Sequence, residues 1–594
     1  MRSPMRGFRV LIAFGFRAAP LQATLFLLCG AVMALMGPLR SFGAKLLVDA
    51  ATAGSLRQGL IAALVLALTA GVGLVVVLYY VDFLFAVVER AGLVADKRLM
   101  ELMGGVAGLA HHEQPEYLDQ LQLLREDRGM LAWMTNATAG LLRVGVQLAA
   151  SAVLLATVQP LLLLLPLFGV VSFVAGKRAQ DLQMQIREAT TEPERLRKHL
   201  FSTALSAPAG KELRVFGLEN ELVRRHHAVS GAVMQARSRA DWRSAWWQAV
   251  DALVFGLAYA GAIGLVLIRA AHGQATPGDV VLTVGLAAGM NGIVSTAVAY
   301  GTHFLTVLKT ARRYLWLEDY ASSVEQLPPD PAAVPARLTD GIVLREVSFR
   351  YPGTGRPVLD GVSLQLPAGS VVALVGENGA GKTTLAKLIC RFYEPDQGQV
   401  LVDGVDLRRF PIGAWRARLS AAFQDFAKFE LLLRETVGVG DLTRIEDSAV
   451  VQAALGRAGA GDVPAALPDG METQLGKAWP AGVDLSGGQW QKLALARGLM
   501  RADPLLVIFD EPTAALDALT EHALFTRFAE AAHRGERAGT VTVLVSHRFS
   551  TVRMADLIVV LGQGRIVEQG NHEELMARRG TYAELYEIQS RAYR

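Results

Sequence analysis

This chain of 594 residues contains the sequence Gly376-Glu377-Asn378-Gly379-Ala380-Gly381-Lys382-Thr383-Thr384, which directly follows an apolar run at residues 371–375. A helical pattern follows this sequence. Glycines at this spacing let backbone N–H groups surround a phosphate, and Lys382 supplies positive charge to the β and γ phosphates. Thr383 is placed to ligate magnesium. A strand, this loop and a helix in that order predict a phosphate-binding loop.

A second apolar run, residues 505–509, ends in the two carboxylates Asp510 and Glu511. Ligands of an α/β sheet bind at the carboxyl ends of its strands, so both side chains are expected at the phosphate loop. We expect Asp510 to hold magnesium through water and Glu511 to polarise an attacking water. Taken alone, such a pair is often only a solvated strand end.

A third motif, Leu485-Ser486-Gly487-Gly488-Gln489, precedes an amphipathic helical stretch. Ser486 and the glycine amides would form an anion site at the amino terminus of that helix. The alternative is an ordinary helix cap. Together, however, the three motifs form the recognised signature of the ATP-binding cassette family, and residues 343–594 resemble its nucleotide-binding domain.

The resemblance implies further site residues in this chain. Tyr351 matches the aromatic residue on which adenine stacks, and Gln424 matches the glutamine that touches magnesium and water. His547 matches the histidine that contacts the γ-phosphate, and Asp517 matches an aspartate at the interface between cassettes. By itself, Tyr351 could be a core aromatic and His547 a satisfied structural histidine.

The same family geometry implies a shared active site. Ser486, Gly488 and Gln489 of one cassette would face the ATP held by the phosphate loop of another. The expected activity is Mg²⁺-dependent ATP hydrolysis, with Glu511, His547 and Gln424 as catalytic residues. A homodimer with two working sites is the simplest assembly, because this chain holds one copy of every motif, and a heterodimer stays open.

The whole chain is 52% hydrophobic with a mean hydropathy of +0.31, so part of it is expected to lie in lipid. Its long apolar runs lie in the first half. Gln159-Pro160 divides one long run into two spans, so six membrane spans are expected. Four early arginines place the amino end inside. The apolar runs lie at residues 18–39, 58–81, 144–176, 252–268 and 280–308. The predicted outer connections lie at residues 40–57, 157–160 and 270–277.

Composition excludes several other classes of protein. A net charge of +4 gives no support for nucleic-acid binding, and no nucleic-acid partner is expected. The two cysteines, Cys29 and Cys390, support neither a disulfide framework nor a cysteine metal site. His111-His112-Glu113 is interpreted as a charged loop, since no further ligand has suitable spacing.

A proline-rich piece around residues 327–335 divides the chain. We expect a six-helix transmembrane domain at 1–322, a linker at 323–340 and an α/β P-loop domain at 341–594. This order resembles the six-helix half-transporters of the exporter type, embedded in the lipid of the cell membrane with the cassette in the cytoplasm. The resemblance implies short docking helices near residues 113–123 and 207–216.

The transported compound is less well specified. Residues 474–492, with Gln424-Asp425-Phe426, resemble bacterial peptide exporters of the lantibiotic type, so we expect export of a peptide or hydrophobic compound. An amino-terminal protease is not expected, because the first span begins near Ala18. Efflux of lipophilic small molecules, drugs or lipids, and import by the same fold remain alternatives. The candidate polar residues of a cavity are Asp82, Asp251, Asn291 and His303. Asp82 and Asp251 lie at the ends of their apolar runs, so a position at the membrane interface is an equal alternative for these two.

Overall fold

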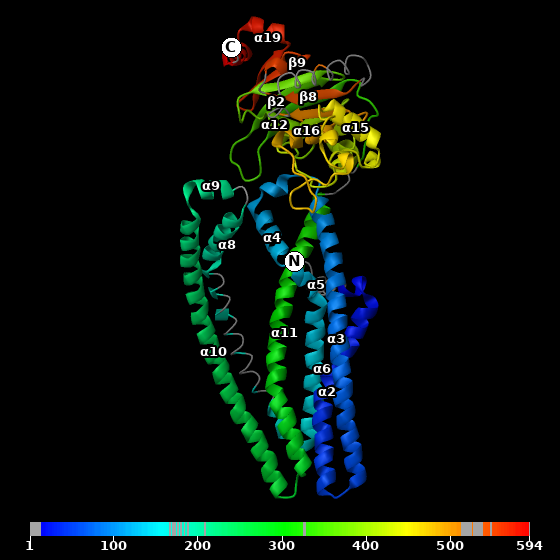
Figure 1. Ribbon diagram of the computed structural model, residues 1–594, viewed down its shortest axis with the longest axis vertical. Helices are drawn as coiled ribbons and strands as arrows, with labels where there is room; N and C mark the ends of the chain where they lie inside the picture. Colours follow the sequence, from blue (N-terminus) through cyan, green and yellow to red (C-terminus); the bar gives the residue numbers. More distant parts are fainter. Residues whose placement is uncertain are drawn as a thin grey trace. The chain divides into compact units, whose positions relative to one another are not determined.

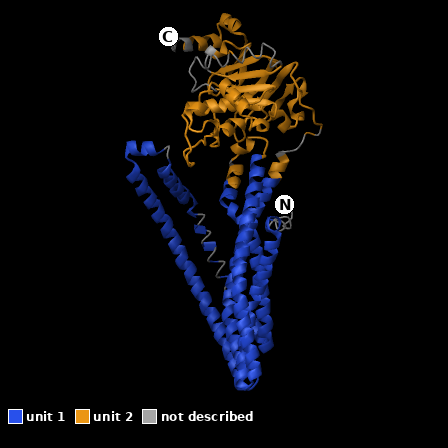
Figure 2. Ribbon diagram, turned by 45° about the vertical axis from the view of Figure 1, so that its right-hand side comes forward, with its two compact units in different colours: residues 1–104, 122–318 blue, residues 105–121, 319–594 orange. Residues whose placement is uncertain are grey.

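The computed structural model describes residues 14–165, 168, 174, 178, 181–182, 185–186, 189–206, 209–324, 328, 330–511, 526, 539–546 and 549–592. The chain divides into two compact units (Figure 2). Unit 1 comprises residues 1–104 and 122–318, and unit 2 comprises residues 105–121 and 319–594. A short segment of the first half, residues 105–121, therefore belongs with the second half.

Unit 1 is built from long helices, and five in the described part of the chain are long and apolar enough to cross a membrane. The fourth of the six predicted spans, after Pro160, falls largely outside the described residues. The five helices are α2 (Pro20–Thr52), α3 (Leu56–Gly104), α6 (Met134–Val158), α10 (Glu219–Ala271) and α11 (Pro277–Val324). The shorter elements of unit 1 are α5 (Arg128–Ala132), η2 (Pro160–Leu164), α8 (Thr191–Leu205) and α9 (Ala209–Phe216). The turn η1 (Ala110–Glu113) belongs to unit 2, and α4 (Pro115–Glu126) begins in unit 2 and ends in unit 1.

Helix α2 packs along α3 and α6, and the three run side by side (Figure 1). Its buried side carries small residues about one turn apart, including Gly30, Ala34 and Gly43. A methyl group added to Gly43 would lie 3.2 Å from the Leu66 side chain. Small side chains at this spacing let helix backbones approach closely, which is how helices associate in lipid.

The predicted outer connection at residues 40–57 is wrong in extent, because α2 continues to Thr52 and α3 begins at Leu56. Two charged residues of this stretch, Lys45 and Asp49, have partners within unit 1. Lys45 Nζ lies 2.5 Å from Asp279 Oδ1, and the Gly278 N–H donates to Asp49 Oδ1 at 2.9 Å. These partners stabilise helix in a stretch that was expected to be a connection because it lies between two apolar runs.

Unit 2 contains two sheets, as the predicted α/β domain requires. A six-stranded sheet has the order β10-β9-β3-β8-β7-β6, in which only the β9–β10 pair is antiparallel. A four-stranded antiparallel sheet has the order β2-β1-β4-β5. The strands are β1 (Gly341–Phe349), β2 (Leu359–Pro367), β3 (Val371–Gly376), β4 (Gln397–Val402), β5 (Val405–Asp406), β6 (Leu419–Ala422), β7 (Leu506–Asp510), β8 (Val541–Val545), β9 (Leu557–Gly562) and β10 (Arg565–Gly570).

The central strand β3 is buried on both faces, which explains its continuous apolar sequence. Val371, Ala373 and Val375 belong to one hydrophobic cluster, and Val372 and Leu374 belong to another. The helices of unit 2 are α12 (Lys382–Ile389), α13 (Ile412–Arg416), α14 (Leu433–Gly438), α15 (Ser448–Arg457), α16 (Gly487–Gly498), α18 (Phe549–Val552), α19 (His572–Arg578) and α20 (Thr581–Ala592). Short η3 to η6 turns are Leu407–Arg409, Leu442–Arg444, Pro464–Ala466 and Gly470–Glu472.

A substitution at Trp415 would test this packing. Trp415 is fully buried on α13, and its Nε1–H donates to the Ile389 carbonyl at 3.1 Å. Trp415→Ala removes a large buried ring and should cost about 3–5 kcal/mol of unfolding free energy. Thermal unfolding of the full chain should show the transition of unit 2 lowered by roughly 10 °C.

The matched control is Trp479→Ala, since Trp479 is 51% exposed in the same unit. Its free energy of unfolding should change by no more than about 0.5 kcal/mol. Equal effects of the two substitutions would contradict the assigned packing.

Candidate functional site

The loop between β3 and α12 requires glycine at three positions. Gly376, Gly379 and Gly381 have φ angles of 144°, 82° and 103°, in the region that favours glycine. A methyl group on Gly376 would also lie 2.1 Å from the Leu561 carbonyl oxygen. The backbone therefore curls tightly at the carboxyl end of β3, and α12 begins at Lys382.

Lys382 lies inside this loop and is only 6% exposed. Its Nζ donates to the carbonyls of Gly376 at 2.8 Å and Glu377 at 2.9 Å. Burial lowers the pKa of Lys382, while the carboxylates of Glu511 and Asp510 act in the opposite direction. The ammonium is thus held at the centre of the loop by backbone oxygens.

Thr383 and Asp510 are joined by a side-chain hydrogen bond beside the phosphate loop. Thr383 Oγ1 donates to Asp510 Oδ1 at 3.1 Å, and Asp510 is 2% exposed at the end of β7. Burial raises the pKa of Asp510, and the hydrogen bond from Thr383 partly offsets that rise. The parallel strands β3 and β7 both flank β8, which brings their carboxyl ends to one edge of the sheet.

This pair fits a magnesium ion, which prefers hydroxyl and carboxylate oxygens and usually keeps water and phosphate ligands. In the described residues, no group of three or more His, Cys, Asp or Glu side chains is arranged to hold a metal. A site made of one carboxylate and one hydroxyl would not form such a group. Gln424 lies just beyond β6, whose Ala422 is in register with Phe509 of β7, so it reaches the same edge.

Glu511 has a φ angle of +47°, a conformation that costs free energy for a residue other than glycine. Its N–H donates to the Val545 carbonyl at 3.0 Å, which anchors the strained backbone to β8. Strain of this kind is concentrated at functional sites. The residue predicted to polarise water therefore begins the turn at the end of β7.

Tyr351 lies beside the phosphate loop. Its hydroxyl is 3.0 Å from Thr384 Oγ1, and Lys387 Nζ lies 5.9 Å from its ring centroid. The ring packs edge-on against Phe349 and Tyr393 at centroid distances of 5.1 and 5.3 Å. An aromatic surface therefore stands next to the start of α12, where a nucleotide base would follow the phosphates.

Ser486 is the N-cap of α16. Its Oγ accepts from the Gln489 N–H at 3.2 Å, while the Ser486 N–H donates to Gln489 Oε1 at 2.9 Å. The ordinary capping interpretation is therefore realised within the chain, and Gly488 lies in the first helical turn. Helix α16 packs in one hydrophobic cluster and α12 in the other, so the two cover opposite faces of the six-stranded sheet.

The predicted residues His547 and Asp517 lie outside the described residues. Their assigned contacts, with the γ-phosphate and between cassettes, stay predictions. The structure also adds a residue that motif analysis missed. Tyr393, in Arg391-Phe392-Tyr393-Glu394-Pro395, donates its hydroxyl to Glu113 Oε1. An aromatic side chain two residues before a proline was its only signal in the sequence.

The predicted docking segments correspond to helical elements. Near 113–123 the chain forms η1 and α4, and the Leu109 N–H of this segment donates to the Phe392 carbonyl at 3.0 Å. Near 207–216 it forms α9, which belongs to unit 1.

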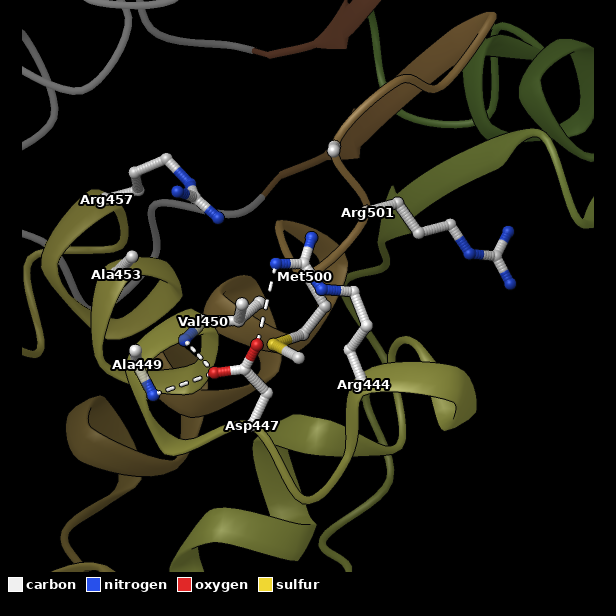
Figure 3. Close-up of a pocket in the computed structure, with 9 residues that line it drawn as sticks. Arg444, Asp447, Ala449, Val450, Ala453, Arg457, Met500 and Arg501 are labelled. Atoms are coloured by element: carbon white, nitrogen blue, oxygen red, sulfur yellow. Dashed lines mark hydrogen bonds and ion pairs between the residues drawn. The ribbon is translucent and has the colours of Figure 1, made fainter.

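A second pocket of unit 2, of about 540 Å³, is lined by three arginines (Figure 3). Asp447 accepts from the amides of Ala449 and Val450 and lies 3.7 Å from Arg444. Arg457 donates to the Leu499 carbonyl and Arg501 to the carbonyls of Arg416 and Leu419. The Arg457 bond joins α15 to the end of α16, and the Arg501 bonds join the following segment to α13 and β6, so these arginines stabilise the fold.

Comparison with known proteins agrees with this geometry. A family model described as "ABC transporter" matches residues 359–514. The ATP-dependent lipid A-core flippase of Chromohalobacter salexigens is 31% identical over 71% of this chain and 70% of its own length. The protein of the same name from Aromatoleum aromaticum is 37% identical over 56% of this chain and 53% of its own length. The chain spans about half the length of the lipid A-core flippases that head this comparison.

A solved structure, a bacterial Atm1-family ABC exporter with ATP bound, matches nearly the whole fold. It has a TM-score of 0.77 at 27% identity and covers 97% of this chain and 98% of its own. The helical half and the phosphate-loop half therefore occur together in a known exporter architecture. The chain belongs to the ABC transporter family and has the fold of an ABC exporter, with a helical membrane domain followed by a carboxyl-terminal ABC cassette.

Proposed function

We propose that this chain is one subunit of a dimeric exporter that uses ATP hydrolysis to move an amphipathic lipid out of the cytoplasm. The observation that carries the ATP-driven part is the site at one sheet edge, where Lys382, Thr383 and Asp510 converge. The cassette would lie in the cytoplasm, where ATP is present.

ATP binding would begin at the glycine loop. Its N–H groups and the start of α12 would hold the phosphates, and Lys382 Nζ would exchange its two carbonyl partners for phosphate oxygens. The base would stack on Tyr351 beside the loop. Gly376 to Thr384 thus bind and orient the nucleotide.

Hydrolysis would follow from the residues at the end of β7. Thr383, Asp510 and Gln424 would hold a Mg²⁺ ion, which supplies positive charge that offsets the phosphate charge. Glu511 would accept a hydrogen bond from water and orient it in line with the γ-phosphorus. The new bond joins the water oxygen to phosphorus as the bond to the β-phosphate oxygen breaks. His547 would contact the γ-phosphate.

The site is proposed to be shared by two chains. Ser486, Gly488 and Gln489 would meet the ATP of a second copy, and Asp517 would lie at that interface. The position of α16 on the sheet face opposite to α12 supports this arrangement. A homodimer completes two equal sites, whereas a heterodimer would need a partner with the same motifs.

The proposed cargo combines an apolar body with a polar, acidic head group. Unit 1 exposes many aliphatic side chains along its helices, yet some polar groups lie inside it. Arg143 stands 5.6 Å from the Tyr80 ring and 5.7 Å from the Tyr300 ring. The Oδ1 atoms of Asn136 and Asn291 are buried without a hydrogen-bond partner in the described residues. The relatives named as lipid A-core flippases support a lipid cargo.

A peptide is the second candidate cargo, because residues 474–492 resemble the lantibiotic-type exporters. In the described structure this stretch forms the loop before α16 and the first turns of that helix, with Trp479 exposed and Lys477 paired to Asp484 at 3.1 Å. It lies in the cassette rather than among the spans, so it gives weaker support than the chemistry of unit 1.

Glu511→Gln should separate nucleotide binding from turnover, because it keeps the side-chain size and removes the negative charge that polarises water. We expect ATP affinity close to that of the unmodified protein and a fall in kcat of about 100-fold or more. Lys382→Ala should instead weaken ATP binding itself. Both are measured by nucleotide titration and steady-state phosphate release.

Lys97→Ala is the control, since the Lys97 side chain is 78% exposed on α3 and should affect neither quantity. Turnover near the normal rate in Glu511→Gln would contradict the assigned hydrolytic role.

Proteoliposomes distinguish the two cargoes. Fluorescent phosphatidylglycerol in the bilayer should stimulate ATP hydrolysis by the protein. The protein should move this labelled lipid between leaflets only when ATP is present. We expect Glu511→Gln liposomes to show the background rate, because the reset by hydrolysis is lost. ATP-dependent accumulation of a cationic amphipathic peptide, with the lipid inert, would favour the peptide exporter instead.

A further inference from the structure

Segment 105–121 joins the core of unit 2 at the aromatic cluster beside the phosphate loop. Leu109 and Ala110 pack on the hydrophobic cluster that contains Phe349 and Tyr393. The Leu109 N–H donates to the Phe392 carbonyl at 3.0 Å. A methyl group on Gly108 would lie 3.3 Å from that same carbonyl oxygen, so the two backbones are in close contact.

A single side-chain hydrogen bond reinforces this backbone contact. The Tyr393 hydroxyl donates to Glu113 Oε1, whereas Glu113 Oε2 is buried with no hydrogen-bond partner in the described part of the chain. A buried carboxylate depends strongly on the partners that it has. Burial and the bond to Glu113 raise the pKa of the Tyr393 phenol, which therefore stays protonated as the donor.

The Tyr393 ring in turn contacts the proposed adenine platform. It is 6% exposed and lies perpendicular to Tyr351, with an interplanar angle of 88° and a centroid distance of 5.3 Å. Phe349 completes the cluster, at 5.3 Å from Tyr393 and 5.1 Å from Tyr351. Edge-on packing of this kind depends on the direction of each ring.

Aromatic contacts also join this segment to Tyr320 of unit 2. His111 is 2% exposed, and its ring centroid lies 4.8 Å from that of Tyr117 and 6.2 Å from that of Tyr320. Tyr117 and Tyr320 are also in contact, at 5.0 Å. A pocket of about 480 Å³ adjoins these rings and Tyr351. Glu113 thus lies in the chain between two packed aromatic residues, His111 and Tyr117, and is bonded to Tyr393.

We propose that Glu113 and Tyr393 are positioning residues, whose hydrogen bond sets the ring of Tyr351 for adenine stacking and makes base recognition depend on segment 105–121. This rests on the proposed function, in which Tyr351 stacks on adenine. Because the segment follows α3 directly in the chain, a displacement of the end of α3 would reach the nucleotide base through this bond. Neither residue touches ATP.

The test uses the purified full-length protein in lipid nanodiscs, with ATP and inorganic tripolyphosphate as probes. Tyr393→Phe and Glu113→Ala should each raise the KM for ATP about 3- to 10-fold, with kcat changed less than about twofold. The inhibition constant of tripolyphosphate, which has no base, should not change. The double variant should be no worse than either single variant, since both remove one bond.

Two variants exclude a merely structural effect. Glu113→Gln keeps an oxygen that can accept from Tyr393 and should restore most of the ATP affinity. Tyr582→Phe is the matched control, because Tyr582 is a buried tyrosine of unit 2 whose hydroxyl lies 2.8 Å from His572 Nδ1 in another part of the core. Its KM for ATP should stay unchanged.

Tyr351→Ala separates the two levels of the argument. If it raises the KM for ATP while Tyr393→Phe does not, the positioning role is overturned and the proposed function stands. If Tyr351→Ala leaves the KM unchanged, the adenine platform itself is wrong and the positioning role fails with it. Equal weakening of ATP and tripolyphosphate by Tyr393→Phe would also overturn the inference, because the defect would then not concern the base.

Discussion

A buried lysine that needs oxygen partners is the constraint around which unit 2 is built. The ammonium of Lys382 is almost fully removed from water and is satisfied by two carbonyls of its own loop. Those carbonyls can point inward only because the loop glycines adopt positive φ angles. The loop is held in place by β3, which is buried on both faces of the sheet. The lysine can exchange these carbonyls for phosphate oxygens without leaving a buried charge unpaired.

Much of this could be predicted from local sequence. The β3 run, the glycine spacing and the carboxylates after residues 505–509 each depend on neighbouring residues alone, and the sheet places them at one edge as expected. The long apolar runs likewise indicated spans, and five are found in the described residues. Backbone preference and hydrophobic periodicity act over a few residues, so these features are readable without knowledge of the fold.

Contacts between distant segments could not be predicted in this way. Lys45 and Asp279 are 234 positions apart, and Glu113 and Tyr393 are 280 positions apart. Their side chains meet only after helices and sheets have packed. Residues 40–57 were expected to form a connection because they lie between two apolar runs, and the sequence does not show that Lys45 has a distant partner. Similarly, the structure shows Ser486 as the cap of α16, and its role as an anion site stays a prediction because capping alone does not distinguish the two.

The link from Glu113 to Tyr351 need not be strong to influence the cassette. An edge-on aromatic pair contributes about 0.5–1.5 kcal/mol, and about 1.4 kcal/mol changes an equilibrium tenfold. A segment that bonds Tyr393 in one conformation and releases it in another would shift nucleotide affinity by the difference between those states, and by no more. By reciprocity, a bound base would favour the conformation of segment 105–121 in which Glu113 is bonded. A single hydrogen bond at the edge of an aromatic cluster is therefore sufficient to make the two events depend on each other.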